Sequence, residues 1–469
     1  MALASAVGQT SWQNTDLVNG GTWGTGSNWS SGAAPTTSGD TVIDNGGWAR
    51  VEASPANIRA LKIGTTAAGN RLSLGAFTLT TRAVSAGEGA GSSGSITIAS
   101  GGTLQTNQAG ATSYSAFLLG ISGTGTLQVD AGGRLYTGGD TRVGYTAGGS
   151  GFATVRGSWQ AAANMSVGVG GTGRLDIGSA GVVTVLDTGV LGVLTLGGAN
   201  TTTSQGTLDI GGAVAAEAAG TLNAASIATR ASGVVRFNHT ETRYRFATDV
   251  ANGAQAIVIS GTGRVQVSAG TTILDAANTY NGGTTVSGGV LLVNNTGATS
   301  ATGSGALLVE INGKLGGVGR VGGAATIEGT LAPGDELGVL SFGSSLTLSA
   351  GSETEITLGG TTRGSGYSAV DVAGALTLGG TLKLTLAEGF ILEDGESLQF
   401  QIFNAGSFTG SFESLILPNT WNGGTIFWDS TALHSGGILS VSTIPEPGSL
   451  ALGALGVIVL VQLRRRTRV

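Results

Sequence analysis

The feature that most constrains the fold of this chain is a glycine that recurs every 24 residues. An aliphatic residue followed by glycine occurs four times at this interval, at Leu119-Gly120, Val143-Gly144, Val167-Gly168 and Leu191-Gly192. Within these units a second glycine follows the strand-opening one after eight residues, as in Gly125 to Gly133 and Gly173 to Gly181. A repeating unit of this size, built from short strands and glycine turns, is typical of one coil of a parallel β-helix.

Between the glycines lie short segments in which every second residue is apolar. Five of them open with glycine and lie at residues 94–98, 125–129, 173–177, 206–210 and 263–267. This alternation predicts strands with one buried face, joined by glycine turns. We therefore predict an all-β fold, a right-handed parallel β-helix over residues 58–360. About 15 coils at about 4.8 Å each would give a rod about 70 Å long.

Aromatic residues gather at both ends of the predicted solenoid. Four of the seven tryptophans, Trp12, Trp23, Trp29 and Trp48, fall within residues 10–57, which we interpret as an N-terminal cap over the first open coil. Residues 361–442 carry longer strands and bulkier side chains, and we interpret them as terminal coils and a C-terminal cap. The alternatives are an aromatic sugar-binding platform at the first end and a separate carbohydrate-binding domain at the second.

Composition is compatible with a folded body that has a thin core. Glycine accounts for 86 of 469 residues and only 11% are charged, but 40% are hydrophobic, so the chain can bury a core. There is no cysteine, which excludes disulfides and thiolate metal sites. The formal net charge of −6 argues against a nucleic-acid partner, because phosphates favour basic patches.

The stretch from 261 to 360 resembles a repeat found in bacterial surface proteins. Its strings include NTYNGGTTVSGGVLLVN at 278–294, GSGALLV at 303–309, GKLGG at 313–317 and GTLAPG at 329–334. Their order looks like the autotransporter-associated β-strand repeat. Residues 23–43, with Trp23, Trp29 and Pro35, likewise resemble the opening segment of autotransporter-like proteins. The resemblance implies a β-helical passenger whose repeat assists secretion and folding. Because the chain ends in a short tail where that family has an outer-membrane domain, we do not expect self-export.

The C-terminal tail carries three consecutive signals. Pro445, Glu446 and Pro447 precede a 16-residue apolar run at 448–463, which is followed by Arg464, Arg465, Arg466 and Arg468. As a helix the run would extend about 24 Å, near the roughly 30 Å of a bilayer core. The arginines can reach the interface and predict a cytoplasmic end, with the rest of the chain exported.

Residues 443–469 together resemble the PEP-CTERM sorting signal of Gram-negative bacteria that produce exopolysaccharide. The resemblance implies that an exosortase-type membrane protease recognises the motif, removes the transmembrane helix and passes the protein to the cell surface or the extracellular space. A plain C-terminal membrane anchor is the alternative. At the other end, residues 1–9 read as the remnant of a secretory signal, with small residues Ala4 and Ala6 at signal-peptidase spacing. An ordinary N-terminus is equally compatible with them.

The sequence contains few candidate catalytic or ligand-binding residues. His239 and His434 are far apart and have no metal-ligand spacing. Residues 170–176 approach a calcium-binding nonapeptide, but the aspartate falls one residue late and the motif does not recur. Asp176 and Asp209 occupy equivalent positions in two Leu-Asp-Ile strands, and glycosidases need paired carboxylates. Solvated acidic side chains are the simpler interpretation, so we predict no catalytic, cofactor-binding or metal residues and no cofactor.

Three functions are compatible with these features. We favour a non-catalytic structural or adhesive rod displayed on the cell surface or in an extracellular polysaccharide matrix. The polysaccharide of this matrix would then be a partner of the protein. A glycan-binding adhesin is the second hypothesis. A polysaccharide lyase or glycosidase is the third.

Overall fold

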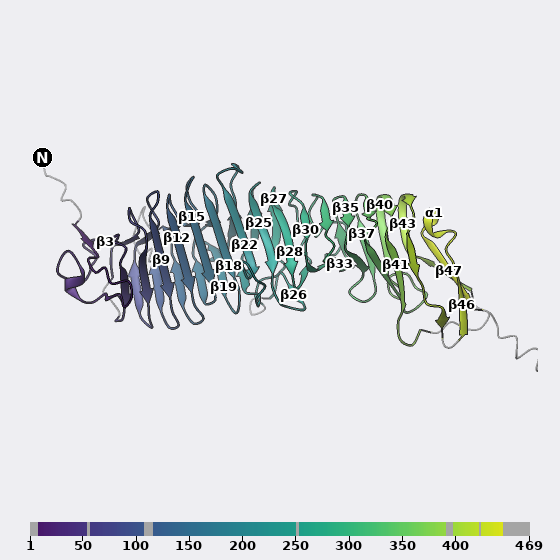
Figure 1. Ribbon diagram of the computed structural model, residues 1–469, viewed down its shortest axis with the longest axis horizontal. Coiled ribbons are helices and arrows are strands. Elements are labelled where there is room, and N and C mark those ends of the chain that lie inside the picture. Colours follow the sequence, from purple (N-terminus) through teal and green to yellow (C-terminus); the bar gives the residue numbers. More distant parts are fainter. Residues whose placement is uncertain are drawn as a thin grey trace, which may run out of the picture.

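The computed structural model describes residues 8–443 except 54–56, 107–115, 250–252, 391–396 and 422–423. It shows an elongated body in which short strands lie side by side across the long axis (Figure 1). The sequence runs steadily along that axis, from the purple N-terminal end to the yellow C-terminal end. The shape follows from a chain whose strands pair mainly with strands of the preceding and following coils.

Four sheets of mainly parallel strands form this body. Within the described residues the first sheet has ten strands, β1 (Gly8–Ser11), β3 (Gly39–Ile43), β5 (Ala60–Ile63), β8 (Ala83–Ala86), β11 (Phe117–Leu119), β14 (Thr141–Val143), β17 (Met165–Val167), β21 (Val193–Leu196), β24 (Ser226–Thr229) and β27 (Val258–Gly261). The third sheet contains β7 (Thr78–Thr81), β10 (Thr103–Thr106), β13 (Arg134–Thr137), β16 (Ser158–Ala161), β19 (Val182–Asp187), β20 (Val190–Leu191) and β23 (Thr221–Asn223).

The second sheet runs the length of the molecule. It contains β2 (Gly21–Thr22), β4 (Trp48–Val51), β6 (Asn70–Leu74), β9 (Ser93–Ile98), β12 (Thr124–Val129), β15 (Ser150–Val155), β18 (Thr172–Ile177), β22 (Gln205–Gly211), β25 (Gly233–Asn238), β28 (Arg264–Ala269), β30 (Thr284–Val286), β32 (Leu307–Val309), β34 (Arg320–Val321), β35 (Ala325–Ile327), β37 (Val339–Phe342), β38 (Leu346–Leu348), β40 (Ala369–Leu378) and β43 (Phe403–Gly410).

The fourth sheet replaces the third in the C-terminal half. It contains β26 (Tyr244–Arg245), β29 (Thr271–Leu274), β31 (Gly289–Val293), β33 (Gly313–Gly317), β36 (Thr330–Pro333), β39 (Glu353–Leu358), β41 (Thr381–Leu386) and β44 (Ser414–Ile416). A C-terminal antiparallel sheet contains β42 (Ser397–Gln401), β47 (Ile438–Thr443), β46 (Gly424–Asp429) and β45 (Thr420–Trp421). Two short helices complete the described elements, the 3-10 helix η1 (Gly26–Asn28) and α1 (Leu433–Gly436).

In the N-terminal half, from β8 to β17, each coil contributes one strand to the first, the second and the third sheet in turn, and successive coils pair in parallel. Phe117 of β11 pairs with Thr141 of β14, and Arg134 of β13 pairs with Ser158 of β16, a separation of 24 residues in both cases. This agrees with the period read from the sequence. The prediction of an all-β fold of stacked parallel strands is confirmed, and the arrangement is consistent with a β-solenoid. The right-handed winding stays a prediction.

The recurring glycines lie at the corner between the first and second sheets. Gly144 follows β14 with φ of +73°, a left-handed conformation that side chains disfavour. A Cβ atom built on Gly144 would lie 2.2 Å from the carbonyl oxygen of Thr172, in the next coil. Gly120 and Gly168 have the same geometry, with φ of +63° and +71°. Only glycine fits this corner, because the neighbouring coil packs directly against its Cα.

The fourth member of the 24-residue series, Leu191-Gly192, does not lie at a corner of the coil. Leu191 ends β20, a two-residue strand that pairs antiparallel with β19, and Gly192 does not form the corner. The corner residues of this coil are Leu196 and Gly197, which has φ of +73°. The β19–β20 hairpin adds five residues to the coil, and the periodicity in the sequence continued through it by coincidence.

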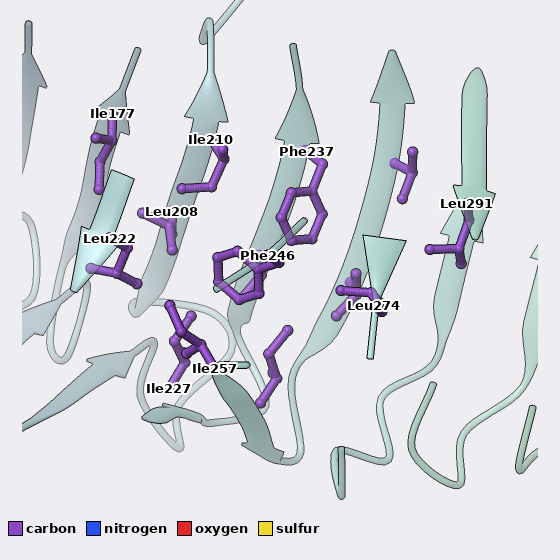
Figure 2. Packing of buried hydrophobic residues seen from close by; sticks show 14 of the residues in the cluster. Ile177, Leu208, Ile210, Leu222, Ile227, Phe237, Phe246, Ile257, Leu274 and Leu291 are labelled. Atoms are coloured by element: carbon purple, nitrogen blue, oxygen red, sulfur yellow. The ribbon is translucent and has the colours of Figure 1, made fainter. Parts of the chain in front are cut away.

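The core is a continuous column of apolar side chains inside the stacked coils. Figure 2 shows Ile177, Ile210 and Phe237 on neighbouring strands facing the same interior. Where the third sheet ends and the fourth begins, Phe237 packs edge-to-face on Phe246, with ring centroids 5.0 Å apart (Figure 2). Large rings fill the interior where the cross-section of the coil changes.

Three N-terminal tryptophans pack inside the first coils. Trp12, Trp23 and Trp29 are each 2% exposed, and the rings of Trp12 and Trp23 lie 4.8 Å from that of Trp29. Trp29 Nε1 also donates a hydrogen bond to the carbonyl oxygen of Trp23 at 2.7 Å. These three rings are therefore core side chains and do not form an exposed sugar-binding platform. Trp48 lies half-buried, and its Nε1 donates to Ser73 Oγ at 2.8 Å.

The C-terminal end of the stack packs against α1 and the segment that follows it. The backbone N–H groups of Ile402 and Phe403 both donate to the carbonyl oxygen of Gly437, at 2.9 and 3.1 Å. These hydrogen bonds join the last coil to the residue that directly precedes β47 of the antiparallel sheet. Among the helices of the described residues, none is long and apolar enough to cross a membrane. The predicted span at 448–463 lies outside those residues.

Candidate functional site

Several residues predicted to matter for sorting lie outside the described structure. Pro445, Glu446, Pro447 and the tail arginines at 464, 465, 466 and 468 all belong to this group. Their roles stay predictions from the sequence. The candidate sites that the structure does describe are a buried carboxylate pair on the second sheet and a groove on the fourth.

The structure brings Asp176 and Asp209 side by side. They are paired in register on β18 and β22, so their equivalent positions in the sequence became neighbours in adjacent coils. Arg174 Nε donates to Asp176 Oδ1 and to Asp209 Oδ2, at 2.8 Å each. Arg236 Nε on β25 donates to Asp209 from the other side. Two carboxylates are thus matched by two guanidinium groups.

A segment between β22 and β23 contacts this cluster and the neighbouring Arg156. Arg236 Nη2 donates to the carbonyl oxygen of Ala213 at 2.7 Å, and Arg156 forms an ion pair with Glu217. Asp209 is 0% exposed and Asp176 is 8% exposed, although both lie on positions that alternate with the core. A polysaccharide could reach neither carboxylate without displacing the arginines. The arrangement is that of a closed ion cluster.

Burial changes the acidity of the pair. Removal of Asp176 from water, together with a hydrogen bond and charge repulsion from Asp209, raises the pKa of Asp176 to about 7. Arg174 opposes this shift by favouring the charged carboxylate. The pair can therefore take up one proton near neutral pH. Sequence reasoning missed Arg174 and Arg236, although Arg174 lies two residues before Asp176 on β18 and Arg236 is paired in register with Asp209.

The two histidines are held by the fold and are not part of a shared site. His239 is 0% exposed, and its Nε2 lies 2.9 Å from Thr272 Oγ1. Its Nδ1 accepts from the backbone N–H of Glu241, so Nε2 carries the proton, and burial lowers the pKa of His239. His434 lies on α1, with its ring 6.4 Å from that of Phe412. In the part of the chain that the structure describes, no group of three or more metal-ligating side chains comes together.

A groove on the outer face of the fourth sheet was not predicted from the sequence. It has a volume of about 330 Å³ and is lined by residues of five successive strands, β29, β31, β33, β36 and β39, and of the loop after β36. The lining residues are Thr271, Val290, Leu292, Lys314, Gly316, Ala332, Pro333, Gly334, Asp335, Glu336, Glu355 and Thr357. The groove therefore runs along the axis of the stack.

Two small residues, Gly316 and Ala332, form the floor of the groove. Gly316 has no side chain, and a Cβ atom there would lie 2.8 Å from the carbonyl oxygen of Ala332 and 3.0 Å from Leu292 Cδ2. Ala332 occupies the next position on β36. A side chain at position 316 would therefore collide with its neighbours, and a larger residue at the half-buried position 332 would fill the groove. The signal in the sequence was this pair of small outward residues between charged ones, but glycine is too common in this chain for it to stand out.

Ion pairs fix the walls of the groove. Lys314 Nζ contacts Glu355 Oε2 at 2.6 Å, and Lys383 Nζ contacts both Glu353 and Glu355, at 3.0 and 3.2 Å. Burial disfavours charge on Glu355, but Lys314 and Lys383 outweigh this effect and lower its pKa.

The opposite wall is the loop after β36. The backbones of Gly317 and Gly334 exchange two hydrogen bonds of 2.8 Å, and Arg243 forms an ion pair with Asp335. The loop is thus attached both to β33 and to the segment before β26.

Comparisons with known proteins found two family models that match segments of this chain. The Passenger-associated-transport-repeat matches residues 265–293, which include groove residues Thr271, Val290 and Leu292. The PEP-CTERM protein-sorting motif matches residues 443–466. The resemblances to the autotransporter-associated repeat and to the PEP-CTERM signal are confirmed, the first over residues 265–293. The resemblance of residues 23–43 to an autotransporter opening segment stays a prediction. A comparison with curated proteins found no match. A sorting motif and a passenger repeat on one chain indicate an exported surface protein.

Proposed function

We propose that the protein is a non-catalytic rod of stacked β coils, displayed at the cell surface or in the extracellular polysaccharide matrix of a Gram-negative bacterium. The observation that carries this proposal is the continuous parallel stack from β1 to β44, followed by a match to a sorting motif. A stack in which each coil contacts mainly its neighbours forms an extended and rigid body. Such a body suits display or spacing outside the cell.

The tail determines where the rod goes in this proposal. The run at 448–463 holds the exported chain in the inner membrane for a time, and the arginines stay on the cytoplasmic side. An exosortase-type membrane protease then recognises Pro445, Glu446 and Pro447 and removes the segment that follows. The rod passes to the surface or is released.

The closed state of the Asp176–Asp209 cluster supports a non-catalytic role. Glycosidases need two carboxyl groups that reach the bond to be cleaved, with space for substrate between them. Here both carboxyl groups are buried and bound by Arg174 and Arg236. A polysaccharide-degrading enzyme would be supported instead if the purified protein released products from a panel of neutral and acidic glycans.

The intact mass of the protein recovered from the outer surface and medium of its host tests the proposal. We expect a species that lacks everything after the 445–447 motif. A variant with Pro445, Glu446 and Pro447 all replaced by alanine should keep its full mass and stay in the inner-membrane fraction. Wild-type protein found only at full mass in that fraction would contradict the proposal and favour a plain anchor.

A glycan-binding adhesin is the second candidate function. The observation that favours it is the groove on the fourth sheet. Proteins commonly bind ligands in concave sites that carry a few polar groups.

A further inference from the structure

We propose that the groove on the fourth sheet binds a neutral polysaccharide chain that lies parallel to the long axis of the rod. The inference deepens the proposed function and rests on it, because a glycan partner presupposes display in a polysaccharide matrix. The shape of the groove suits such a chain. Five successive strands at about 4.8 Å spacing give a channel about 19 Å long, which suits a linear chain of several sugar units.

The backbone of the groove argues against an extended peptide as ligand. A peptide that adds to a sheet needs a free strand edge. Around the groove, β31 pairs with β29 and β33, and β36 pairs with β33 and β39. The backbone groups of these strands are therefore already used within the sheet. A ligand must be recognised through side chains and through the loop after β36.

The charges around the groove argue against an anionic polymer. The groove and the ion pairs attached to it contain four carboxylates, Asp335, Glu336, Glu353 and Glu355, and three cations, Arg243, Lys314 and Lys383. Each of the three cations contacts a carboxylate. Glu336 is exposed at the rim. A polyuronic acid or a nucleic acid would bring further negative charge to this site at a cost.

The remaining chemistry suits a chain rich in hydroxyl groups. The walls offer carboxylate acceptors, the Lys314 ammonium and the hydroxyls of Thr271 and Thr357. The short side chain of Ala332 leaves room on the floor for the flat face of a sugar ring, with the apolar side chains of Val290 and Leu292 also lining the groove. Sites for small uncharged ligands commonly combine an apolar floor with a few polar groups that fix orientation.

Affinity electrophoresis of the full-length protein in detergent, in gels containing single polysaccharides, tests the proposal. The panel has neutral glucans and galactomannan, anionic alginate and cationic chitosan oligomers. We expect at least one neutral polymer to retard the protein more than alginate or chitosan does. This retardation should persist in 0.5 M salt, where the Debye length of about 4 Å screens long-range electrostatic attraction.

Ala332→Trp is the decisive variant because the new ring fills the floor of the groove. We expect it to weaken binding of that neutral polymer at least tenfold. Ala228→Trp is the matched control, since Ala228 lies on an outward position of β24 in the first sheet, and its binding should equal that of the wild type. Glu336→Gln, which changes an exposed rim side chain and leaves the floor intact, should weaken binding twofold to fivefold and guards against a folding defect in Ala332→Trp.

Three results would overturn the inference. These are no retardation by any neutral polymer, stronger retardation by alginate or chitosan, or unchanged binding by both groove variants. None of them touches the intact-mass experiment, which depends only on the tail. A correctly processed rod that binds no neutral glycan would therefore reject the groove as a site and leave the proposed display function standing.

Discussion

At the residue scale, Gly144 combines a left-handed backbone with close contact to the next coil. Its φ is +73°, and an added Cβ would lie 2.2 Å from Thr172 O. We expect Gly144→Ala to destabilise the protein by about 2–5 kcal/mol, from the left-handed conformation and the steric overlap together. The measurement is the midpoint of urea unfolding followed by circular dichroism.

Gly148 provides the control for this prediction. It also has positive φ, +85°, but nothing lies within 4 Å of an added Cβ. Gly148→Ala should therefore cost only the conformational part, about 1–2 kcal/mol. Equal losses for the two variants would show that contact with the next coil does not matter at the corner.

The raised pKa of Asp176 predicts a specific dependence of stability on pH. The folded protein holds the Asp176 proton up to about pH 7, whereas the unfolded chain releases it near the ordinary value of 3.8. Between these pH values the folded state binds more protons, so the contribution of this group to stability falls as pH rises. The contribution is complete below about pH 4 and is lost by the time the pH exceeds 7.

Asp176→Asn removes this titration while keeping the size of the side chain. We expect the stability of the wild type relative to Asp176→Asn to decrease between pH 4.5 and pH 8, as measured by urea unfolding at several pH values. Asp140→Asn is the control for the chemical change, because the Asp140 side chain is 52% exposed. A difference between wild type and Asp176→Asn that increases with pH would contradict the assigned direction.

At the element scale, the tryptophan cluster stabilises the first coils. Trp29 touches the rings of both Trp12 and Trp23 and is 2% exposed. Trp29→Ala should cost about 3–5 kcal/mol, as is usual for a large buried ring. Because a solenoid is stabilised by contacts between neighbouring coils, we expect the loss to appear mainly in residues 8–53. Hydrogen exchange should speed up there and stay unchanged around β15 to β19.

Trp48→Ala is the comparison within the same region. Trp48 is half-buried, and Arg50 Cζ lies over its ring in a cation–π contact, 5.9 Å from the ring centroid. Its removal should cost about 1 kcal/mol, in line with a partly exposed contact. If Trp48→Ala were as damaging as Trp29→Ala, the outer face would contribute more to stability than the buried cluster.

At the scale of the whole molecule, the stack should tolerate the removal of a complete coil. Deletion of residues 120–143 takes out 24 residues and joins Leu119 directly to Gly144, so a corner glycine is kept. The strands on either side can then pair as successive coils do now. We expect a folded protein, shorter by about 4.8 Å, with the same circular dichroism per residue.

Deletion of half a coil is the contrasting variant. Removing residues 120–131 joins Leu119 to Gly132. It removes β12 and leaves β13 and β14, the other two strands of the coil. This variant should be digested rapidly by protease under conditions in which the 24-residue deletion resists. Equal resistance of the two deletions would argue against the coil as the unit of stability.

The sequence by itself determined the repeating part of this structure. Alternation of apolar residues and the glycines at a 24-residue interval are local properties, and they sufficed to predict stacked parallel strands, because strand periodicity and left-handed glycine corners act within a few residues. The repeat and tail motifs were likewise readable as short strings at 278–334 and 443–469.

Tertiary structure decided what depends on neighbours from other coils. The glycine spacing placed the corner at Gly192, whereas in the structure it lies at Gly197 because this coil contains the additional β19–β20 hairpin. The glycine spacing alone does not indicate this hairpin. Asp176 became a buried acid because Arg236, 60 positions further along the chain, closes the cluster around Asp209. The groove required five strands and one loop to meet on one face. Burial and charge pairing depend on distance in space, which the order of residues alone does not give.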